Sequence, residues 1–369
     1  MRKWEDNLRR VEPYIPGEQP QSQDVIKLNT NENPYPPSPK VEEAIRSMDL
    51  GTAMRKYPDP ESGKLVRALA EYYGTDRDHI FVGMGSDDVL ATAFMSFFNS
   101  DNPIVFPDIT YSFYPVWAKL YGIPYKEIPL YGDGFLLRPI DYGYIDPDGD
   151  GITDESGEAV TNGGVVIANP NAPTGIMLSR KDIEKILIAN PDVIVIVDEA
   201  YVDYADESAL PLLPDYENLV IVRTFSKSRA MAGMRIGFAI ASPRLIRVMN
   251  DVAQSVNSYT KSATSLEAAV ASLQDEEYFR ARIDDVLRTR ARTVMELKKR
   301  SFNVLPSSTN FVFAAPTWTT GEDLYDGLRE RDIYVRHFSK ERINNYLRIT
   351  IGTDEQMNDL FAAIDDIHA

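Results

Sequence analysis

The sequence contains no cysteine, and this absence removes several kinds of chemistry at once. Disulfide bonds, thiolate metal sites and cysteine nucleophiles are all excluded, and a reducing cytoplasm is a compatible compartment. The chain also lacks an uninterrupted apolar run near the roughly 20 residues that a membrane helix needs. Its opening residues, MRKWEDNLRR, have no apolar core of a signal peptide. We therefore expect a soluble, cytoplasmic protein.

The chain has fewer basic than acidic residues. The chain has 39 Lys and Arg against 56 Asp and Glu, a formal net charge of −17 at pH 7. The resulting negative field opposes binding to nucleic acid or to an anionic membrane surface, so neither is an expected partner. The same field opposes the approach of an anionic small molecule. A phosphate or carboxylate ligand would therefore have to be held by a few arginines and amide groups placed locally.

Hydrophobic periodicity predicts an α/β protein. Continuous Val/Ile strands separated by helices favour a mostly parallel sheet with both faces covered. Ser62 precedes a helical pattern with Leu65, Leu69 and Tyr72 on one face, and Gly74 ends it. The next expected strands are 104–106, 165–168, 193–197, 219–222 and 236–241, and the expected helices are 87–98, 112–121, 180–189 and 243–253.

The pattern divides the chain into three expected parts. Residues 1–40, rich in Pro, Asn, Gln and Glu, predict an extended arm that could lie across a partner. Residues 41–255 form the predicted large domain, and residues 256–369 form a smaller α/β C-terminal domain. The expected elements of the smaller domain are a long helical region at 262–300, strands at 311–314, 333–336 and 346–351, and helices at 322–331 and 355–367.

An acidic, glycine-rich insertion at residues 146–158 is expected to be an exposed loop or hairpin. Asp146, Asp148 and Asp150 imitate the start of an EF-hand calcium loop, but its twelfth position is Gly157 instead of Glu. We expect no metal site.

A lysine and an aspartate follow two of the predicted strands. Lys227 comes shortly after strand 219–222, and Asp198 directly follows strand 193–197. Both would lie where ligands bind in open α/β sheets, at the carboxyl ends of the strands. Taken alone, a solvated loop lysine and a helix N-cap are the simpler interpretations. Together they suit a pyridine cofactor, because a carboxylate beside the ring nitrogen keeps it protonated as an electron sink.

The turn Asn-Pro-Asn-Ala-Pro-Thr-Gly follows strand 165–168. Such residues dominate turns generally, so a structural loop is one explanation. Alternatively, the Asn171 amide could donate to a phenolate oxygen on the ring, with Tyr201 as a second donor. Two donors would stabilise the negative charge of that oxygen and lower the pKa of an imine beside it.

A phosphate cradle is predicted at the start of helix 87–98. Gly85, Ser86 and Asp87 lie where free amides at a helix N-terminus bind dianions, although a plain capped helix start explains the stretch equally well. The amides would contribute, since the Asp87 carboxylate would repel phosphate. Arg235 could close the other side with a charge-assisted pair. Tyr111 is a candidate to stack on the ring, or is a core residue.

In this order and spacing, the motifs resemble the fold-type I pyridoxal-phosphate aminotransferases, class II, over nearly the whole chain. The resemblance implies a large domain with a mostly parallel sheet flanked by helices. It implies pyridoxal 5′-phosphate as the cofactor, held as a Schiff base by Lys227, which later moves a proton between Cα and C4′. It also implies that Asp198 pairs with the pyridine nitrogen and that Asn171 and Tyr201 contact the ring oxygen. The expected catalytic residues are Lys227, Asp198 and Tyr201.

The resemblance also assigns the other cofactor contacts. Tyr111 stacks on the ring, and Tyr57 reaches the phosphate of the neighbouring subunit, which implies a homodimer with shared active sites. The residues expected to hold the phosphate within one chain are Ser86, Asp87, Ser226 and Arg235, and Gly85 is a further expected cofactor contact.

Within that family the chain is most similar to members that act on histidinol phosphate. The segment Val-Glu-Pro-Tyr-Ile-Pro-Gly at 11–17 carries the match and places Tyr14 near the substrate. Arg336 and Arg348 carry it further, because one site must hold the phosphate of histidinol phosphate and the carboxylates of glutamate in turn. Arginine recognises both anions bidentately. Without the resemblance, the simpler interpretation is that both arginines are exposed strand residues.

The expected reaction is transamination between L-glutamate and imidazole acetol phosphate. It gives L-histidinol phosphate and 2-oxoglutarate in L-histidine biosynthesis, by alternation between pyridoxal and pyridoxamine forms. Two alternatives stay open at this point: an aromatic amino acid aminotransferase and, less favoured, a pyridoxal-phosphate decarboxylase of phospho-amino acids.

Overall fold

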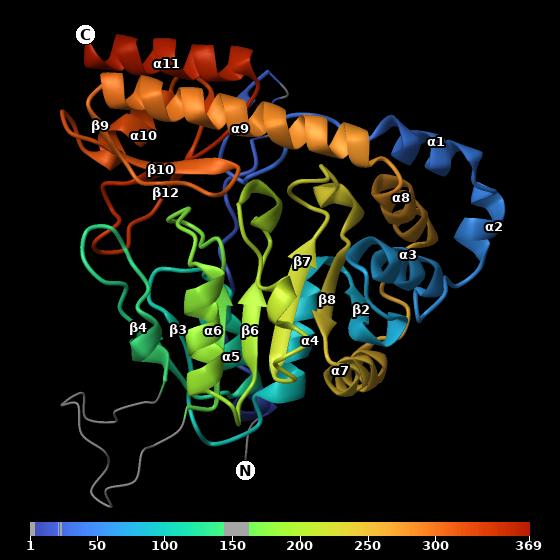
Figure 1. Ribbon diagram of the computed structural model, residues 1–369. Coiled ribbons are helices and arrows are strands. Elements are labelled where there is room, and N and C mark those ends of the chain that lie inside the picture. The colour runs from blue at the N-terminus through green and yellow to red at the C-terminus, as the bar shows by residue number, and fades with distance from the viewer. Residues whose placement is uncertain (1–3, 21, 23, 144–161) are drawn as a thin grey trace, which may run out of the picture.

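A seven-stranded sheet forms the centre of the larger part of the molecule (Figure 1). The computed structural model describes residues 4–143 and 162–369, apart from residues 21 and 23, so the insertion at 146–158 lies outside the described residues. In spatial order the strands are β2 (Ile80–Gly83), β8 (Gly237–Ala241), β7 (Leu219–Thr224), β6 (Val195–Asp198), β5 (Gly164–Ala168), β3 (Ile104–Pro107) and β4 (Tyr125–Ile128). β8 runs opposite to the other six strands, which share one direction, and this confirms the predicted α/β class and mostly parallel sheet.

Each face of this sheet has its own hydrophobic core. Val165 and Ile167 of β5 pack into one core, while Val166 and Ala168 pack into the other. This alternation follows from the two-residue period of a strand, and it requires every residue of the run to be apolar. The continuous Val/Ile runs of the sequence therefore place these strands in the middle of the structure.

Helices cover both faces. The helices α3, α6 and α8 contribute to one core, and α4, α5 and α7 to the other. Where the structure describes this part, its eight α-helices are α1 (Pro39–Ser47), α2 (Leu50–Arg55), α3 (Gly63–Tyr73), α4 (Gly85–Phe97), α5 (Tyr114–Tyr121), α6 (Arg180–Ala189), α7 (Pro243–Val256) and α8 (Ala263–Leu273). In the described part of the chain, no helix is both long and apolar enough to span a membrane.

A second, four-stranded sheet is antiparallel throughout and has a separate core. Its strands in spatial order are β12 (Arg336–His337), β13 (Leu347–Thr350), β10 (Phe311–Pro316) and β9 (Phe302–Val304). The helices packed with it are α9 (Glu276–Lys299), α10 (Gly321–Arg329) and α11 (Asp354–His368). Figure 1 shows α9 running from this sheet across to α8 and α1. The predicted domain boundaries at residues 41 and 256 stay a prediction.

Several elements differ from the prediction. The helical region expected at 262–300 is broken at Gln274 and Asp275 into α8 and α9. The strand expected at 333–336 is two short strands, because β11 (Ile333–Tyr334) pairs with the N-terminal segment while β12 pairs with β13. The edge strands β2 and β4 and the helices α1 and α2 were not predicted. β2 is a buried, apolar run of only four residues, whereas β4 carries Lys126 and Glu127 and has no continuous apolar run. Short 3-10 turns complete the described chain at Trp4–Asn7, Arg77–His79, Pro139–Tyr142, Val202–Tyr204, Leu210–Leu212 and Ala232–Met234.

The N-terminal segment lies between the two sheets. Its strand β1 (Ile26–Lys27) pairs in parallel with β11. Beyond it, the Leu28 carbonyl accepts a hydrogen bond from the Thr350 backbone at 2.9 Å. The Asn33 amide then donates to the carbonyls of Lys227 and Ser228. Residues 28–33 thus cross from the small sheet to the edge of the large one.

Candidate active site

A cavity of about 140 Å³ opens at the carboxyl ends of β5, β6 and β7. The strand order explains its position, because Asp198 is the last residue of β6 and Lys227 follows β7. The residues that line it are Ser86, Asp87, Tyr111, Ala168, Pro170, Ala172, Asp198, Ala200, Tyr201, Ser226, Lys227, Ala232 and Arg235. Most of the residues predicted from the sequence to bind the cofactor are therefore brought together at one place.

Asp198 is a buried carboxylate, with 5% of its surface exposed. The Tyr114 hydroxyl donates to it at 2.9 Å and the Ala200 backbone N–H at 3.2 Å. No ion pair joins it to a cation among the described residues. Burial raises the pKa of Asp198 to about 7, against the two hydrogen bonds, which favour the ionised form. An uncompensated carboxylate of this kind suits a cationic partner inside the cavity. Tyr114 carried no signal in the sequence beyond its place in an aromatic-rich helix start.

Lys227 reaches from the end of β7 toward the N-terminal segment. Its Nζ donates to the Thr30 carbonyl at 3.1 Å and lies 5.9 Å from the centre of the Tyr201 ring. Lys227 lines both this cavity and the adjoining one described below. Its amine is therefore accessible from two sides.

Asn171 lies in the predicted turn, but its amide does not reach the cavity. Its Nδ2 donates to the Ile109 carbonyl and to the Thr174 hydroxyl, both at 2.9 Å, and its Oδ1 accepts from the Thr110 hydroxyl. Both amide hydrogens are used to hold the loop, and Ala172 lines the cavity instead. The structure thus does not bring Asn171 to this cavity with the other predicted cofactor residues, and the amide stabilises the turn.

The start of α4 forms one end of the cavity. Gly85 has φ of +81°, and a Cβ there would lie 2.5 Å from Arg235 Nη2, so glycine allows the guanidinium to cover the first turn. Asp87 pairs with Arg235 at 3.3 Å and accepts from the Tyr111 hydroxyl at 2.8 Å. The Arg235 guanidinium and the Tyr111 hydroxyl offset the negative charge of the Asp87 carboxylate, which would otherwise repel a phosphate. The first-turn amides, which have no partner within a helix, and Arg235 make this end suitable for an anion.

Ser226 and Tyr57 complete the set of predicted cofactor residues. Ser226 lines the cavity and is buried beside Thr224, whose hydroxyl donates to it at 2.9 Å. Tyr57 is 81% exposed and packs on Tyr259 at 4.6 Å, away from the cavity of its own chain. Its predicted role in a neighbouring subunit stays a prediction.

A second cavity of about 200 Å³ adjoins the first through Lys227, Tyr201, Tyr111 and Ala172. The three residues predicted to bind the substrate, Tyr14, Arg336 and Arg348, all line it.

The two arginines of this cavity lie side by side, because Arg336 and Arg348 are direct partners across β12 and β13. Arg348 is half-buried. Its Nη2 donates to the Asn29 carbonyl at 2.8 Å, while its Nε has no hydrogen-bond partner among the described residues. Burial lowers the pKa of Arg348, and the nearby Arg336 lowers it further. A desolvated donor beside a second cation suits an anionic ligand.

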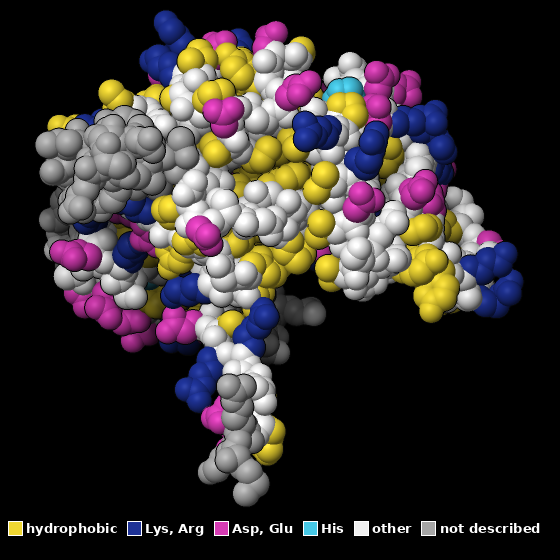
Figure 2. Space-filling model, turned by 90° about the horizontal axis from the view of Figure 1, so that it is seen from below, with side chains coloured by type: hydrophobic (Ala, Val, Ile, Leu, Met, Phe, Trp, Pro, Cys, Tyr) yellow, Lys and Arg dark blue, Asp and Glu magenta, His cyan; other side chains and the backbone are white. Residues whose placement is uncertain are grey.

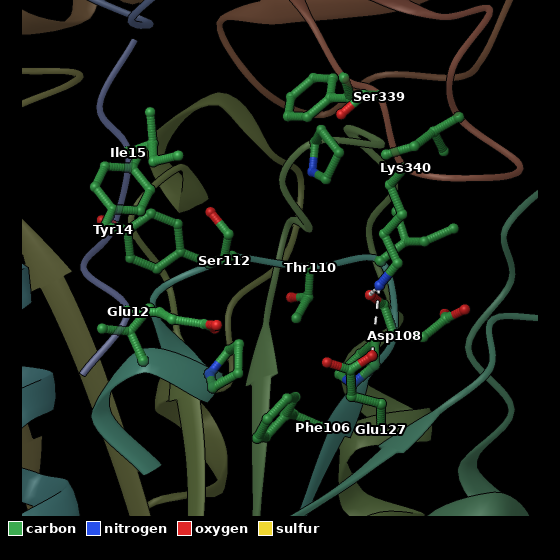
Figure 3. A pocket seen from close by; sticks show the side chains of 18 of the residues that line it. Glu12, Tyr14, Ile15, Phe106, Asp108, Thr110, Ser112, Glu127, Ser339 and Lys340 are labelled. Carbon is green, nitrogen blue, oxygen red and sulfur yellow. Dashed lines mark hydrogen bonds and ion pairs between the residues drawn. The ribbon is translucent and has the colours of Figure 1, made fainter. Parts of the chain in front are cut away.

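A wider opening of about 420 Å³ leads to this second cavity and shares Tyr14, Ser112 and Arg336 with it. Figure 3 shows Glu12, Tyr14 and Ile15 on one side of the opening and Ser339 and Lys340 on the other. Lys340 Nζ donates to the Asp108 carbonyl and pairs with Glu127, so its charge is engaged. This opening is the approach to the site.

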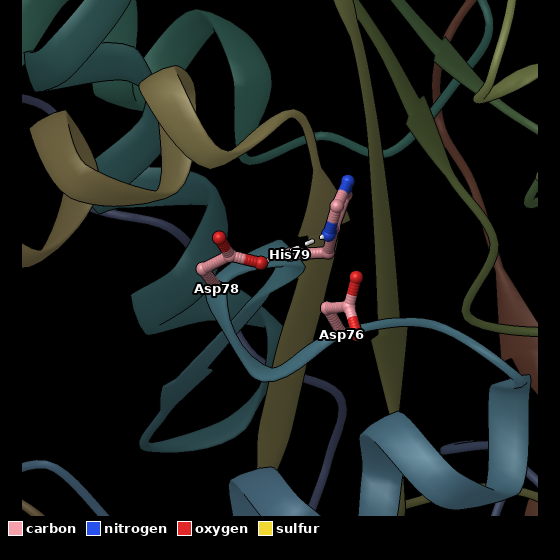
Figure 4. A group of neighbouring side chains, drawn as sticks. All are labelled: Asp76, Asp78 and His79. Atoms are coloured by element: carbon pink, nitrogen blue, oxygen red, sulfur yellow. Dashed lines mark hydrogen bonds and ion pairs between the residues drawn. The ribbon is translucent and has the colours of Figure 1, made fainter.

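One group of possible metal ligands occurs among the described residues: Asp76, Asp78 and His79, whose ligand atoms lie within 4.8 Å of one another (Figure 4). His79 Nδ1 is 3.1 Å from Asp78 Oδ1, and both aspartates are exposed. The group precedes β2 and lies at its amino end. It is therefore at the edge of the sheet opposite the two cavities and takes no part in the site.

Comparisons with known proteins agree with this geometry. The profile of the family "Aminotransferase class I and II" matches residues 23–364. A histidinol-phosphate aminotransferase of Acinetobacter baumannii (strain SDF) is 49% identical over 358 residues, which are 96% of this chain and 94% of the relative. The enzyme of the same name from Marinomonas sp. (strain MWYL1) is 48% identical over 98% of this chain and 99% of its own. The crystal structure of histidinol-phosphate aminotransferase from Sinorhizobium meliloti, in complex with pyridoxal-5′-phosphate, superposes with a TM-score of 0.80 at 26% identity and covers 93% of this chain and 90% of that one.

Proposed function

Because the chain belongs to the aminotransferase class I and II family, we propose that it transfers an amino group between L-histidinol phosphate and 2-oxoglutarate. In the biosynthetic direction, L-glutamate and imidazole acetol phosphate give L-histidinol phosphate and 2-oxoglutarate, a step of L-histidine biosynthesis. The observation that carries the proposal is a lysine amine at the junction of two cavities. One contains a buried carboxylate without a cationic partner among the described residues, and the other contains paired arginines.

The family uses pyridoxal 5′-phosphate, and the first cavity fits this group at both ends. A protonated ring nitrogen would give Asp198 the cationic partner that the described side chains do not supply. The first-turn amides of Ser86 and Asp87 with the Arg235 guanidinium would hold the phosphate. Tyr111 lines the cavity between these ends and would stack on the ring.

When bound, the cofactor supplies an aldehyde that takes up the amine of the substrate and a ring that draws electrons from its Cα–H bond. Lys227 Nζ would take the proton from Cα of the substrate and deliver it to C4′ of the cofactor, and the Thr30 carbonyl accepts a hydrogen bond from this nitrogen at 3.1 Å. Asp198 would keep a proton on the ring nitrogen, and the Tyr201 hydroxyl would donate to the ring oxygen.

Arg348 and Arg336 bind the anions of both substrates in turn. Histidinol phosphate presents a phosphate, whereas glutamate presents two carboxylates, and guanidinium groups pair bidentately with either. The two arginines are direct partners across one strand pair, which supports the proposal that one site serves both half-reactions. Tyr14, stacked on Phe113 at 4.2 Å, forms the wall of this cavity on the side of the N-terminal segment.

The proposal is tested by half-reactions of the holoenzyme with single amino donors. Histidinol phosphate and glutamate should each remove the absorbance of the lysine-linked cofactor, and phenylalanine should do so much more slowly. Lys227→Ala should lack the cofactor adduct that borohydride reduces. A faster reaction with phenylalanine would assign an aromatic aminotransferase instead, and release of carbon dioxide from a phospho-amino acid would assign a decarboxylase.

We further propose a homodimer with shared active sites. Large apolar side chains are exposed on two segments: Trp4 and Ile15 on the N-terminal segment, and Met54 and Tyr57 in and after α2, each more than 70% exposed. Figure 2 shows both segments projecting from the body of the molecule, with apolar side chains gathered between them. Such contiguous apolar surface is typical of an interface. Light scattering should give twice the chain mass, and a monomeric holoenzyme would contradict the proposal.

A cytoplasmic location stays a prediction.

A further inference from the structure

We propose that Asn31 is a positioning residue that directs the Tyr201 hydroxyl proton toward the cofactor, so that this tyrosine acts as a donor and never as an acceptor there. The inference rests on the proposed function and concerns the same site. It assigns a role in the chemistry to a residue of the N-terminal segment, 170 positions from its partner in the chain.

Asn31 is held rigidly where the segment passes between the sheets. It is 1% exposed and has φ of +56°, a left-handed conformation that asparagine tolerates better than most residues. Its backbone N–H donates to the Thr350 hydroxyl at 3.0 Å, and its carbonyl accepts from the Asn310 amide at 3.0 Å. Neither backbone group is free to rotate away from the site.

The orientation of the Asn31 amide follows from the neighbouring hydroxyl. The Thr350 hydroxyl accepts the backbone N–H of Asn31, and its own proton goes to Asn31 Oδ1 at 3.1 Å. With Oδ1 used in this way, Nδ2 faces Tyr201 Oη at 2.8 Å. A reversed amide would leave the Thr350 proton without this acceptor.

This contact determines the direction of the tyrosine proton. An amide Nδ2 is only a donor, so the Tyr201 oxygen must be the acceptor toward Asn31. The single phenolic proton then points away from Asn31. Tyr201 lines the cavity that contains Lys227 and Asp198, which is where that proton can be donated.

Asn171, the second donor predicted for the ring oxygen, does not line this cavity, so the Tyr201 hydroxyl would be the main donor to that oxygen. Both hydrogens of the Asn171 amide bind within their own loop, and the residue at the cavity wall is Ala172. The ring oxygen of pyridoxal phosphate is adjacent to the carbon that forms the imine, so its donor must lie near the lysine. Tyr201 meets this condition, with its ring centre 5.9 Å from Lys227 Nζ. Stabilising the ring oxygen lowers the pKa of the imine.

The experiment is a spectroscopic pH titration of the resting holoenzyme, which measures the imine pKa without turnover. Tyr201→Phe removes the donor and should raise this pKa by about one unit or more. Asn31→Asp should raise it similarly, because a carboxylate accepts the phenolic proton and turns it away from the cofactor. Asn31→Gly keeps the left-handed backbone without the amide and should raise the pKa by a smaller amount. In the Tyr201→Phe background, Asn31→Gly should add no further shift.

The outcomes separate the two proposals. If Asn31→Gly and Asn31→Asp both leave the imine pKa at the wild-type value while Tyr201→Phe raises it, the positioning role is wrong and the proposed function stands. If Asn31→Gly shifts the pKa equally with and without the Tyr201 hydroxyl, Asn31 does not act through that hydroxyl, and the inference is also wrong. If the wild-type protein shows no cofactor absorbance that Lys227→Ala removes, the proposed function itself fails.

Discussion

Replacing Arg348 with alanine separates substrate binding from stability. The guanidinium lines the second cavity and donates one hydrogen bond to the Asn29 carbonyl, while its buried Nε has no partner among the described residues. Truncating one partner of a buried charged pair costs about 2–5 kcal/mol. Arg348 is only half-buried, which favours the lower part of that range, about 2–3 kcal/mol. At 1.4 kcal/mol per factor of ten, the loss is about 30- to 140-fold in affinity.

Both substrates should suffer, because one guanidinium is proposed to bind the phosphate of one and a carboxylate of the other. Single-turnover half-reactions with histidinol phosphate and with glutamate measure this directly. The melting temperature should change little, since the lost bond to Asn29 is offset by removal of a desolvated cation whose pKa burial already lowers. Arg342→Ala is the matched control: it removes the same charge, but this exposed arginine pairs with Asp108 at 3.1 Å and should leave both affinities within about twofold. Loss of affinity for one substrate alone would refute the shared anion site.

Three further substitutions test the cofactor cavity. Asp198→Asn should stabilise the cofactor-free protein at pH 8 but hardly at pH 4. Folding raises the pKa of Asp198 to about 7, so this carboxyl increasingly destabilises the folded state as pH rises from about 4 to about 7. Thermal melts at both pH values measure the effect, and equal stabilisation at both would contradict a raised pKa of Asp198 as its origin. Gly85→Ala should weaken cofactor binding at least about tenfold in a fluorescence titration, since its Cβ would displace the Arg235 guanidinium and Gly85 has positive φ; unchanged affinity would show that Arg235 does not hold the phosphate. Ala172→Asn should place a second donor at the cavity wall and lower the imine pKa by less than about one unit. A raised or unchanged imine pKa in a spectroscopic titration would show that the ring oxygen does not lie beside residue 172.

Local signals predicted much of the fold. The strands β3, β5, β7 and β8 and the helices α4, α6, α7 and α11 occur within a few residues of their predicted positions. Continuous apolar runs and the helical period report burial directly, so these elements follow from nearby residues alone. The strand at 333–336 was wrong because its two halves pair with different partners, one of them from the N-terminal segment. No local pattern carries that information.

The sequence by itself determined which residues stand at the ends of strands, and so it placed Lys227 and Asp198 at one edge of a sheet. Only the tertiary structure decided what each polar side chain binds. It directed the Asn171 amide into its own loop and brought Asn31 against Tyr201 from a distant segment. The reason is physical: backbone conformation is governed by neighbours in the chain, whereas a side-chain hydrogen bond goes to whichever donor or acceptor the packing of remote segments brings within about 3 Å.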